Sequence, residues 1–165
     1  MADNYLQFCI TVPFKARSEL TWFEKTMAQL SVAVIVEQWK DKKSPLAQSR
    51  ETQALLKRFN DEGWDFIDMQ FEITKPSPTS SHGSVTLYAE ECANPKQVAA
   101  VLEAYLRRFH PTGVLTFSWA YTCSKMRSDN FGGGAAVVTA DGSKIIDALD
   151  WAEDLAAQFM ASTTG

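Results

Sequence analysis

The sequence predicts a single α+β domain built on an antiparallel-rich sheet, and three observations lead to this fold class. The chain has 165 residues, the usual size of one domain. Several segments alternate apolar and polar residues at every second position, as half-buried strands do. Between them lie segments whose apolar residues recur at every third or fourth position, which is typical of amphipathic helices.

Strand patterns occur five times along the chain. The alternation is cleanest at 67–74, and the run from Leu115 to Tyr121 is expected in the centre of the sheet. Residues 124–134 then let the chain reverse, so that the next run returns beside it as a hairpin. Pro13 ends the first strand because it removes a backbone donor. The five predicted strands span 6–12, 67–74, 85–89, 115–122 and 135–140.

Two helical segments are predicted in the first half of the chain. Ser18 can cap the first helix. Residues 31–40 are rich in β-branched side chains but follow without a helix breaker, so we expect the helix to continue and leave a strand as the alternative. Ser44 as cap and Pro45 in the first turn predict a second helix to about Phe59. The buried stripe of the first helix is Leu20, Phe23, Met27 and Leu30.

Two further helices are predicted in the second half. Asn94 is a natural cap, Pro95 suits the first helical position, and Gln97 can complete a capping box, so a helix should run to Phe109. Asp141 or Ser143 can cap the last helix. The apolar residues expected to share one face of that helix are Ile145, Leu149, Ala152, Ala156 and Phe159.

The order of these elements predicts the topology. The first six, with the two early helices counted as one crossover, follow the split βαβ pattern of the ferredoxin-like arrangement. A hairpin strand and a C-terminal helix are added, which gives five strands with helices on one face. Residues 75–83 are low in sequence complexity and predict a mobile hairpin loop, and 161–165 predict a frayed tail.

Composition excludes several function classes. The net charge of −4 and the pI of about 5.2 disfavour binding to nucleic acid or to an anionic membrane. The apolar run 32–36 is too short to span a bilayer, and the N-terminus does not resemble a secretory signal. Three cysteines without a close pair indicate a reducing cytoplasm. No spacing of cysteines and histidines suggests a metal site, and no motif suggests a cofactor.

The face of the sheet opposite the helices should carry the polar half of each strand. A solvated face is the simplest interpretation, because an antiparallel sheet can leave one side in water. The functional alternative is an acidic surface that binds a basic partner. A catalytic carboxylate pair is a weaker alternative, since Asp68 and Glu72 would stand roughly 13 Å apart at strand rise. The candidate partner-binding residues are Asp68, Gln70, Glu72, Tyr88 and Glu90.

The segment after the central strand holds a second set of candidates. Three consecutive glycines could cradle an anion, but we favour a turn or bulge that needs positive φ, because the residues that follow them predict a strand. Lys125 could lower the pKa of Cys123, yet neither histidine is placed to assist. Of the five tryptophans, Trp22 or Trp39 could be exposed and anchor a partner. The loop candidates are Cys123, Lys125, Arg127, Gly132, Gly133 and Gly134.

Parts of the second half resemble a known family. The segments that carry the likeness are Leu87-Tyr-Ala-Glu-Glu91, Trp119-Ala-Tyr-Thr-Cys-Ser-Lys125 and Phe131-Gly-Gly-Gly-Ala-Ala-Val-Val-Thr-Ala-Asp141. They are similar to a family of small uncharacterised bacterial and mobile-element proteins. The resemblance transfers no activity, but it makes an inhibitor or adaptor that acts by protein contact more plausible.

These observations together predict a non-enzymatic, cytoplasmic protein-binding module. Its contact surface would be the acidic sheet face or the loop 124–134, and its partner another protein or a second copy of the chain. The alternative is a small-molecule binder or enzyme with a pocket near Cys123 and the glycines. A third, weaker alternative is a nucleic-acid mimic, which would need carboxylates at phosphate-like spacing.

Overall fold

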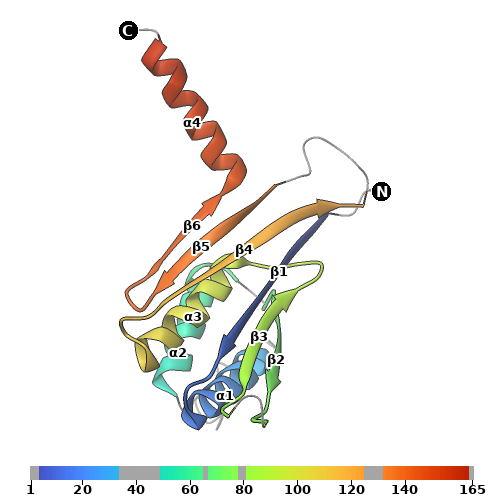
Figure 1. Ribbon diagram of the computed structural model, residues 1–165, viewed down its shortest axis with the longest axis vertical. Helices are drawn as coiled ribbons and strands as arrows, with labels where there is room; N and C mark the ends of the chain where they lie inside the picture. Colours follow the sequence, from blue (N-terminus) through green and yellow to red (C-terminus); the bar gives the residue numbers. More distant parts are fainter. Residues whose placement is uncertain (1–3, 34–48, 65–66, 78–80, 125–131, 164–165) are drawn as a thin grey trace.

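The computed structural model describes residues 4–33, 49–64, 67–77, 81–124 and 132–163. Within these residues six strands form one antiparallel sheet in the order β2-β3-β1-β4-β5-β6, and four helices accompany it (Figure 1). The predicted α+β class is therefore confirmed. The elements are β1 (Asn4–Pro13), α1 (Arg17–Ala33), α2 (Arg50–Asp61), β2 (Gln70–Thr74), β3 (Ser84–Ala89), α3 (Pro95–Phe109), β4 (Val114–Cys123), β5 (Gly132–Thr139), β6 (Ser143–Asp147) and α4 (Ala148–Thr163).

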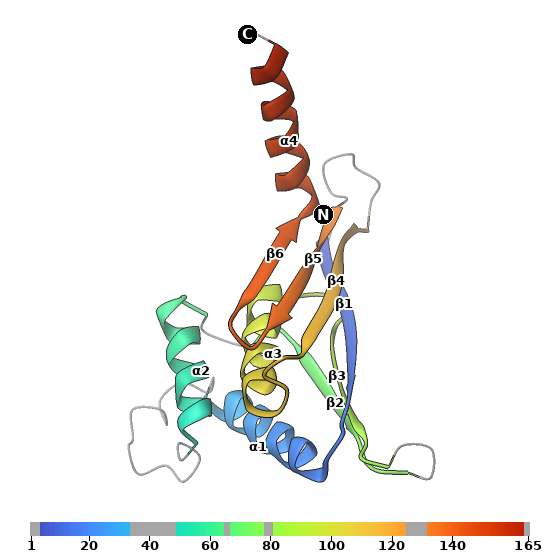
Figure 2. The same cartoon turned by 60° about the vertical axis from the view of Figure 1, so that its left-hand side comes forward.

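The helices fall into two groups. Figure 2 shows α1, α2 and α3 on one side of the sheet, and the opposite side, here called the open face, is not covered by them. Helix α4 instead continues from the end of β6 and projects away from the rest of the fold (Figures 1 and 2). The chain thus has a layered body and one helix outside it.

The core lies between the sheet and α1 to α3. The predicted stripe of α1 is confirmed, because Phe23, Met27 and Leu30 are fully buried and Leu20 is nearly so. They pack with the apolar side of α3, where Leu102 is also fully buried, and with alternate residues of β1, β3 and β4. Burying such a side chain contributes about 1.5–3 kcal/mol, so this layer holds the body together.

The first two helices begin elsewhere than predicted. Helix α1 starts at Arg17, so Ser18 lies inside its first turn. Helix α2 starts at Arg50, and its cap is Ser49, whose side chain accepts from the backbone N–H of Thr52. The earlier cap at Ser44 and the first turn at Pro45 fall in 34–48, outside the described residues, as does most of the ambiguous segment 31–40. Helix α1 does continue to Ala33.

Helix α3 begins as the sequence predicts. The side chain of Asn94 accepts from the backbone N–H of Lys96, and Pro95 occupies the first turn. The amide oxygen of Gln97 accepts from the backbone N–H of Asp68 at 2.9 Å, a longer-range partner than a capping box would supply. This buried glutamine joins the start of α3 to the segment before β2, where the strand begins at Gln70 rather than at Ile67.

The prediction of five strands was wrong, because Ser143–Asp147 forms a sixth strand rather than the start of a helix. Two adjacent β-branched residues, Ile145 and Ile146, pair with Ala136 and Ala135 of β5. The cap of α4 is Asp147, whose carboxylate accepts from the backbone N–H of Leu149 at 3.0 Å. Pairing with β5 therefore outweighed the helical spacing of the apolar residues.

The three glycines belong to β5 and form neither a turn nor a bulge with positive φ. Gly132, Gly133 and Gly134 pair with Tyr121, Ala120 and Trp119 of β4. A Cβ on Gly134 would collide with the indole ring of Trp119 and with the carbonyl oxygen of Ile146. Glycine is needed here because a large ring crosses the neighbouring backbone, which is a packing requirement rather than a conformational one.

Candidate functional site

The acidic candidates lie at the β2–β3 end of the sheet. Gln70 stands opposite Tyr88, and Glu72 stands opposite Thr86, with both Gln70 and Glu72 exposed. Glu90 follows the end of β3 and is exposed. Asp68 precedes β2 and is half-buried, and burial raises its pKa. The structure thus brings Gln70, Glu72 and Tyr88 together but leaves Asp68 partly withdrawn from solvent.

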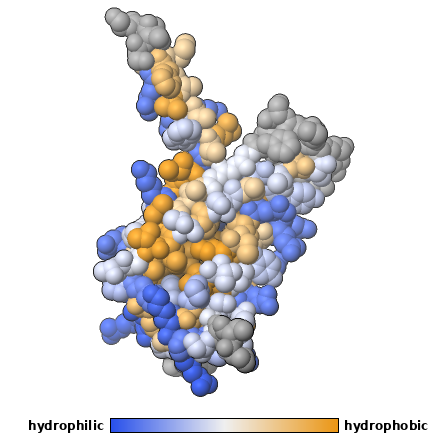
Figure 3. All heavy atoms as spheres, in the orientation of Figure 1, coloured by the Kyte–Doolittle hydropathy of each residue, from blue (hydrophilic) through white to orange (hydrophobic). Residues whose placement is uncertain are grey.

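The half of the open face formed by β4, β5 and β6 carries three exposed apolar side chains. Val114, Val137 and Ile146 are exposed on β4, β5 and β6, and the strand register places them on the same side of the sheet. We call these three residues the apolar strip. Figure 3 shows apolar side chains gathered on this half of the molecule and along α4. The register places Thr116, Thr139 and Lys144 beside these residues on the same face, so the strip is interrupted by polar side chains.

Helix α4 exposes the largest apolar side chains in the described part of the chain. Leu149, Trp151, Phe159 and Met160 are exposed to 58, 57, 66 and 71 %. We call these four residues the α4 face. Because residues three, four, seven and eight apart share a side of a helix, Trp151, Leu155 and Phe159 form a stripe at one margin of a broad apolar side. Leu149 and Met160 lie at its other margin, beyond Ala152 and Ala156. The remaining side carries Asp150 at its middle and Glu153 and Asp154 at its margins, with no basic residue.

Tyr121 lies near the carboxylates at the junction of β6 and α4. Burial raises the pKa of Tyr121, and the nearby negative charges of Asp147 and Asp150 act in the same direction. Tyr121 belongs to β4, on the side of the sheet that carries Trp119. The direction in which α4 leaves the fold is set by β6, which it follows without a connecting residue.

Helices α2 and α3 enclose a basic hollow of about 300 Å³, here called the arginine groove. Arg50 and Arg58 come from α2, Arg107 and Arg108 from α3, and Ala100 and Ala104 line its floor. Arg58 bonds the buried carboxylate of Glu103 at 2.6 Å, and Arg108 pairs with Glu51. With four arginines against the two glutamates Glu51 and Glu103, the groove is positively charged.

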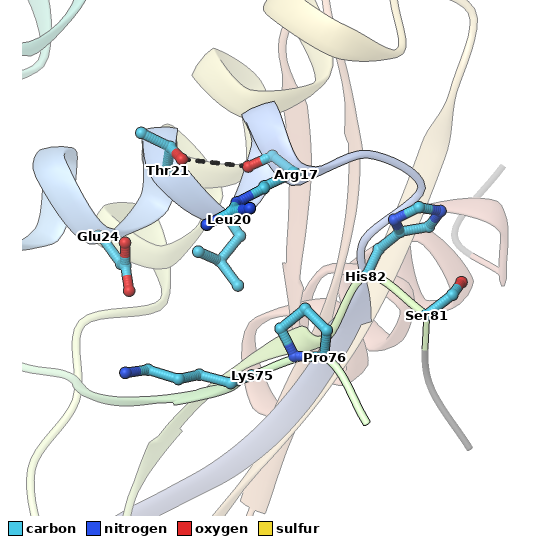
Figure 4. Close-up of a pocket in the computed structure, with 8 residues that line it drawn as sticks. All are labelled: Arg17, Leu20, Thr21, Glu24, Lys75, Pro76, Ser81 and His82. Atoms are coloured by element: carbon cyan, nitrogen blue, oxygen red, sulfur yellow. Dashed lines mark hydrogen bonds between the residues drawn. The ribbon is translucent and has the colours of Figure 1, made fainter. Parts of the chain in front are cut away.

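A larger hollow of about 630 Å³ lies between α1 and the connection from β2 to β3 (Figure 4). Arg17, Lys75, His82 and Glu24 surround it, and Thr21 donates to the carbonyl oxygen of Arg17 at 3.2 Å. All of these residues except His82 are exposed. Such exposed side chains form a hollow open to solvent, without the convergent buried polar groups of a typical small-molecule site.

The loop candidates are only partly described. Cys123 ends β4, is half-buried, and stands opposite Asn4 of β1. Lys125 and Arg127 lie in 125–131, outside the described residues. The three glycines belong to β5 and pair with β4, so the structure does not place them in a loop beside Cys123. The hollows described above lie around the three body helices, away from Cys123.

The body also contains a buried polar cluster formed by Glu19, Tyr105 and His110. Tyr105 donates to Glu19 Oε2 at 2.6 Å, and the backbone N–H of Lys15 donates to the same oxygen at 3.1 Å. His110 Nε2 lies 3.2 Å from the Tyr105 hydroxyl and 3.4 Å from Glu19 Oε2. We call it the core triad; it joins the start of α1 to the end of α3, so we interpret it as structural.

Nothing in the sequence indicated that Trp151 is exposed, and of the two candidates for an exposed tryptophan, Trp22 is contradicted and Trp39 is not tested. Trp22 is buried, and its indole N–H donates to Glu51 Oε2 at 3.1 Å, whereas Trp39 lies outside the described residues. The signal available in the sequence is the amphipathic 148–160 segment. Its apolar side gives no indication of whether the fold itself or another molecule covers it.

No helix in the described part of the chain combines the length and the apolar character needed to cross a bilayer. The described His, Cys, Asp and Glu side chains form no group of three that could hold a metal ion. Family models, curated proteins and solved structures gave no match to the chain, so the resemblance noted above stays a prediction.

Proposed function

We propose that the chain is a non-enzymatic protein-binding module and that the α4 face is its principal contact surface. One observation carries the proposal: a helix of 16 residues stands outside the body and exposes Leu149 and Trp151 by more than half. An exposed apolar surface of this size is costly in water and is typical of a surface that a partner covers. Tryptophan is also enriched among the residues that dominate binding energy at interfaces.

The topology supports two parts of the chain with different roles, a body and an added contact surface. The order β2-β3-β1-β4, with crossovers through α1–α2 and through α3, supports the ferredoxin-like assignment for the body. On this proposal β5, β6 and α4 are additions that present the contact surface. The exposed free thiols of Cys9 and Cys92 fit a reducing compartment, so we place the module in the cytoplasm.

The acidic part of the open face is the second candidate surface. Glu72 and Glu90 are exposed there, and Tyr88 lies opposite Gln70. This surface would favour a partner with a basic face. It ranks second because its exposed side chains are polar and lose little by staying in water.

A charge scan of α4 tests the proposal. Leu149→Asp and Trp151→Asp should each reduce recovery of the bound partner at least tenfold when the tagged chain is captured from its native cells, because each puts a charge in the apolar contact. Ala157→Asp is the matched control, since it adds the same charge to the acidic side of the same helix. Undiminished recovery with Leu149→Asp and Trp151→Asp would contradict the proposal. If partner recovery falls only when Asp68, Glu72 and Glu90 are replaced by Lys, the contact surface is the acidic part of the open face instead.

A further inference from the structure

We propose that the partner of the α4 face is a second copy of the chain, an inference that rests on the proposed function. Two copies pair their β6 strands around a two-fold axis, and α4 of each copy docks in the arginine groove of the other. Four features of the described residues lead to this arrangement: the free edge of β6, the position of α4 relative to that edge, the charges of α4 and the groove, and the absence of a linker.

The first feature is the edge strand. In the described sheet β6 pairs only with β5, so its outer edge offers backbone groups to another strand. Antiparallel pairing of two copies centred on Ile145 places Ser143 opposite Asp147 and Lys144 opposite Ile146. Like charges do not meet in this register. At the other edge, pairing two β2 strands centred on Glu72 would oppose two carboxylates, which destabilises a sheet.

The second feature is the placement of elements at the two ends of β6. Helix α4 begins at one end, whereas α2 and α3 lie toward the other (Figures 1 and 2). At that other end, Ser143 donates to Glu103 at 2.7 Å, and Arg107 donates to the carbonyl oxygen of Ala140 at 3.1 Å. A two-fold axis reverses the strand, so the α4 end of one copy lies beside the groove end of the other.

The third feature is complementarity between α4 and the arginine groove. The helix presents a broad apolar side, from Trp151 round to Met160, with Asp154 at one margin and Glu153 at the other, and it has no basic residue. The groove has a floor that includes Ala100 and Ala104, with arginines on α2 and on α3. Small floor residues let a helix approach closely, while the rims attract its acidic borders. Such charge pairing fixes orientation and register at an interface.

The fourth feature explains why α4 does not fill the groove of its own chain. Strand β6 ends at Asp147 and α4 begins at Ala148, so no connecting residues let the helix fold back. Docking therefore takes place between copies, as in an exchange of C-terminal helices.

Complementary charge reversals provide the test, read by sedimentation equilibrium of the full chain. The wild type should have about twice the single-chain mass of 18.4 kDa. Glu153→Lys with Asp154→Lys should weaken self-association at least tenfold, as should Arg50→Glu with Arg107→Glu. An equimolar mixture of the two variants should recover the dimer, because each α4 then meets a groove of opposite charge. Circular dichroism of each variant should match the wild type.

Each other outcome overturns the inference in a recognisable way. A wild type that stays monomeric at the highest concentrations contradicts it. An Arg50→Glu, Arg107→Glu variant that still dimerises excludes the groove, as expected for contact between two α4 helices alone. A mixture that does not recover the dimer excludes the pairing of α4 with the groove. These results do not decide the proposed function. If the chain is monomeric but Leu149→Asp abolishes binding of a different protein, the chain is still a protein-binding module, and only the identity of its partner is wrong.

Discussion

Replacement of Gly134 by alanine is expected to lower the free energy of unfolding by about 2–3 kcal/mol, the upper part of the range for an overpacked site. The added Cβ would meet the indole ring of Trp119 and the carbonyl oxygen of Ile146. Trp119 is buried, so its ring cannot rotate into solvent, and the Ile146 carbonyl belongs to β6. Strands β4, β5 and β6 would therefore have to move apart within the sheet.

Gly132→Ala is the matched control for this experiment. Its Cβ would lie 3.3 Å from a ring carbon of Tyr121, which is exposed and can shift by a few tenths of an ångström. Both substitutions remove the same backbone freedom from the unfolded chain, so their difference reports packing. Urea unfolding followed by tryptophan fluorescence measures both. Equal stability of the two variants would mean that Trp119 does not lie across Gly134.

Replacement of Glu19 by alanine is expected to lower the free energy of unfolding at pH 7 by about 3 kcal/mol, the scale of a lost charged hydrogen bond that leaves a buried hydroxyl unpaired. The buried Tyr105 would lose the acceptor of its 2.6 Å hydrogen bond. Glu24→Ala, at an exposed position of the same helix, should change stability by no more than about 0.5 kcal/mol. Similar losses in both variants would contradict the structural role of the core triad.

The core triad also predicts how stability depends on pH. Burial alone would raise the pKa of Glu19, but hydrogen bonds from Tyr105, from the Lys15 backbone and from His110 outweigh it, and the pKa is lowered. The stability that the ionised carboxylate contributes is present above the ordinary pKa of 4.5 and is lost as the pH falls through the lower folded-state value. Glu19→Gln should therefore have a shallower loss of stability below pH 4.5 than the wild type. If Glu19→Gln loses stability below pH 4.5 as steeply as the wild type, Glu19 is not the group responsible.

The sequence was most informative where one local pattern decides the structure. The stripe of α1 and the cap at Asn94 were predicted correctly because helix periodicity and capping depend on residues a few positions apart. The hairpin of β4 and β5 was predicted from alternation and a polar connection. These features need no knowledge of distant segments.

Prediction from sequence failed where the local structure depends on contacts with a distant segment of the chain. The spacing of Ile145 and Leu149 fits a helix, yet Ile145 and Ile146 pair with β5 and form β6. The need for Gly134 comes from Trp119, which lies across from it on another strand. The amphipathic pattern of α4 was recognised, but its position outside the body depends on where β6 ends. The sequence therefore favours the acidic face as the contact surface, whereas the structure favours α4.

Hydroxyl-radical footprinting at single tryptophans tests most directly whether the α4 face is a contact surface. The full chain would be labelled once at nanomolar concentration and once in the assembled state recovered from its native cells. Trp151 should be oxidised rapidly in the dilute protein and several-fold more slowly in the assembly, while buried Trp22 should react slowly in both states. Equal oxidation of Trp151 in the two states, with protection appearing instead at Tyr88 on the acidic face, would contradict the account.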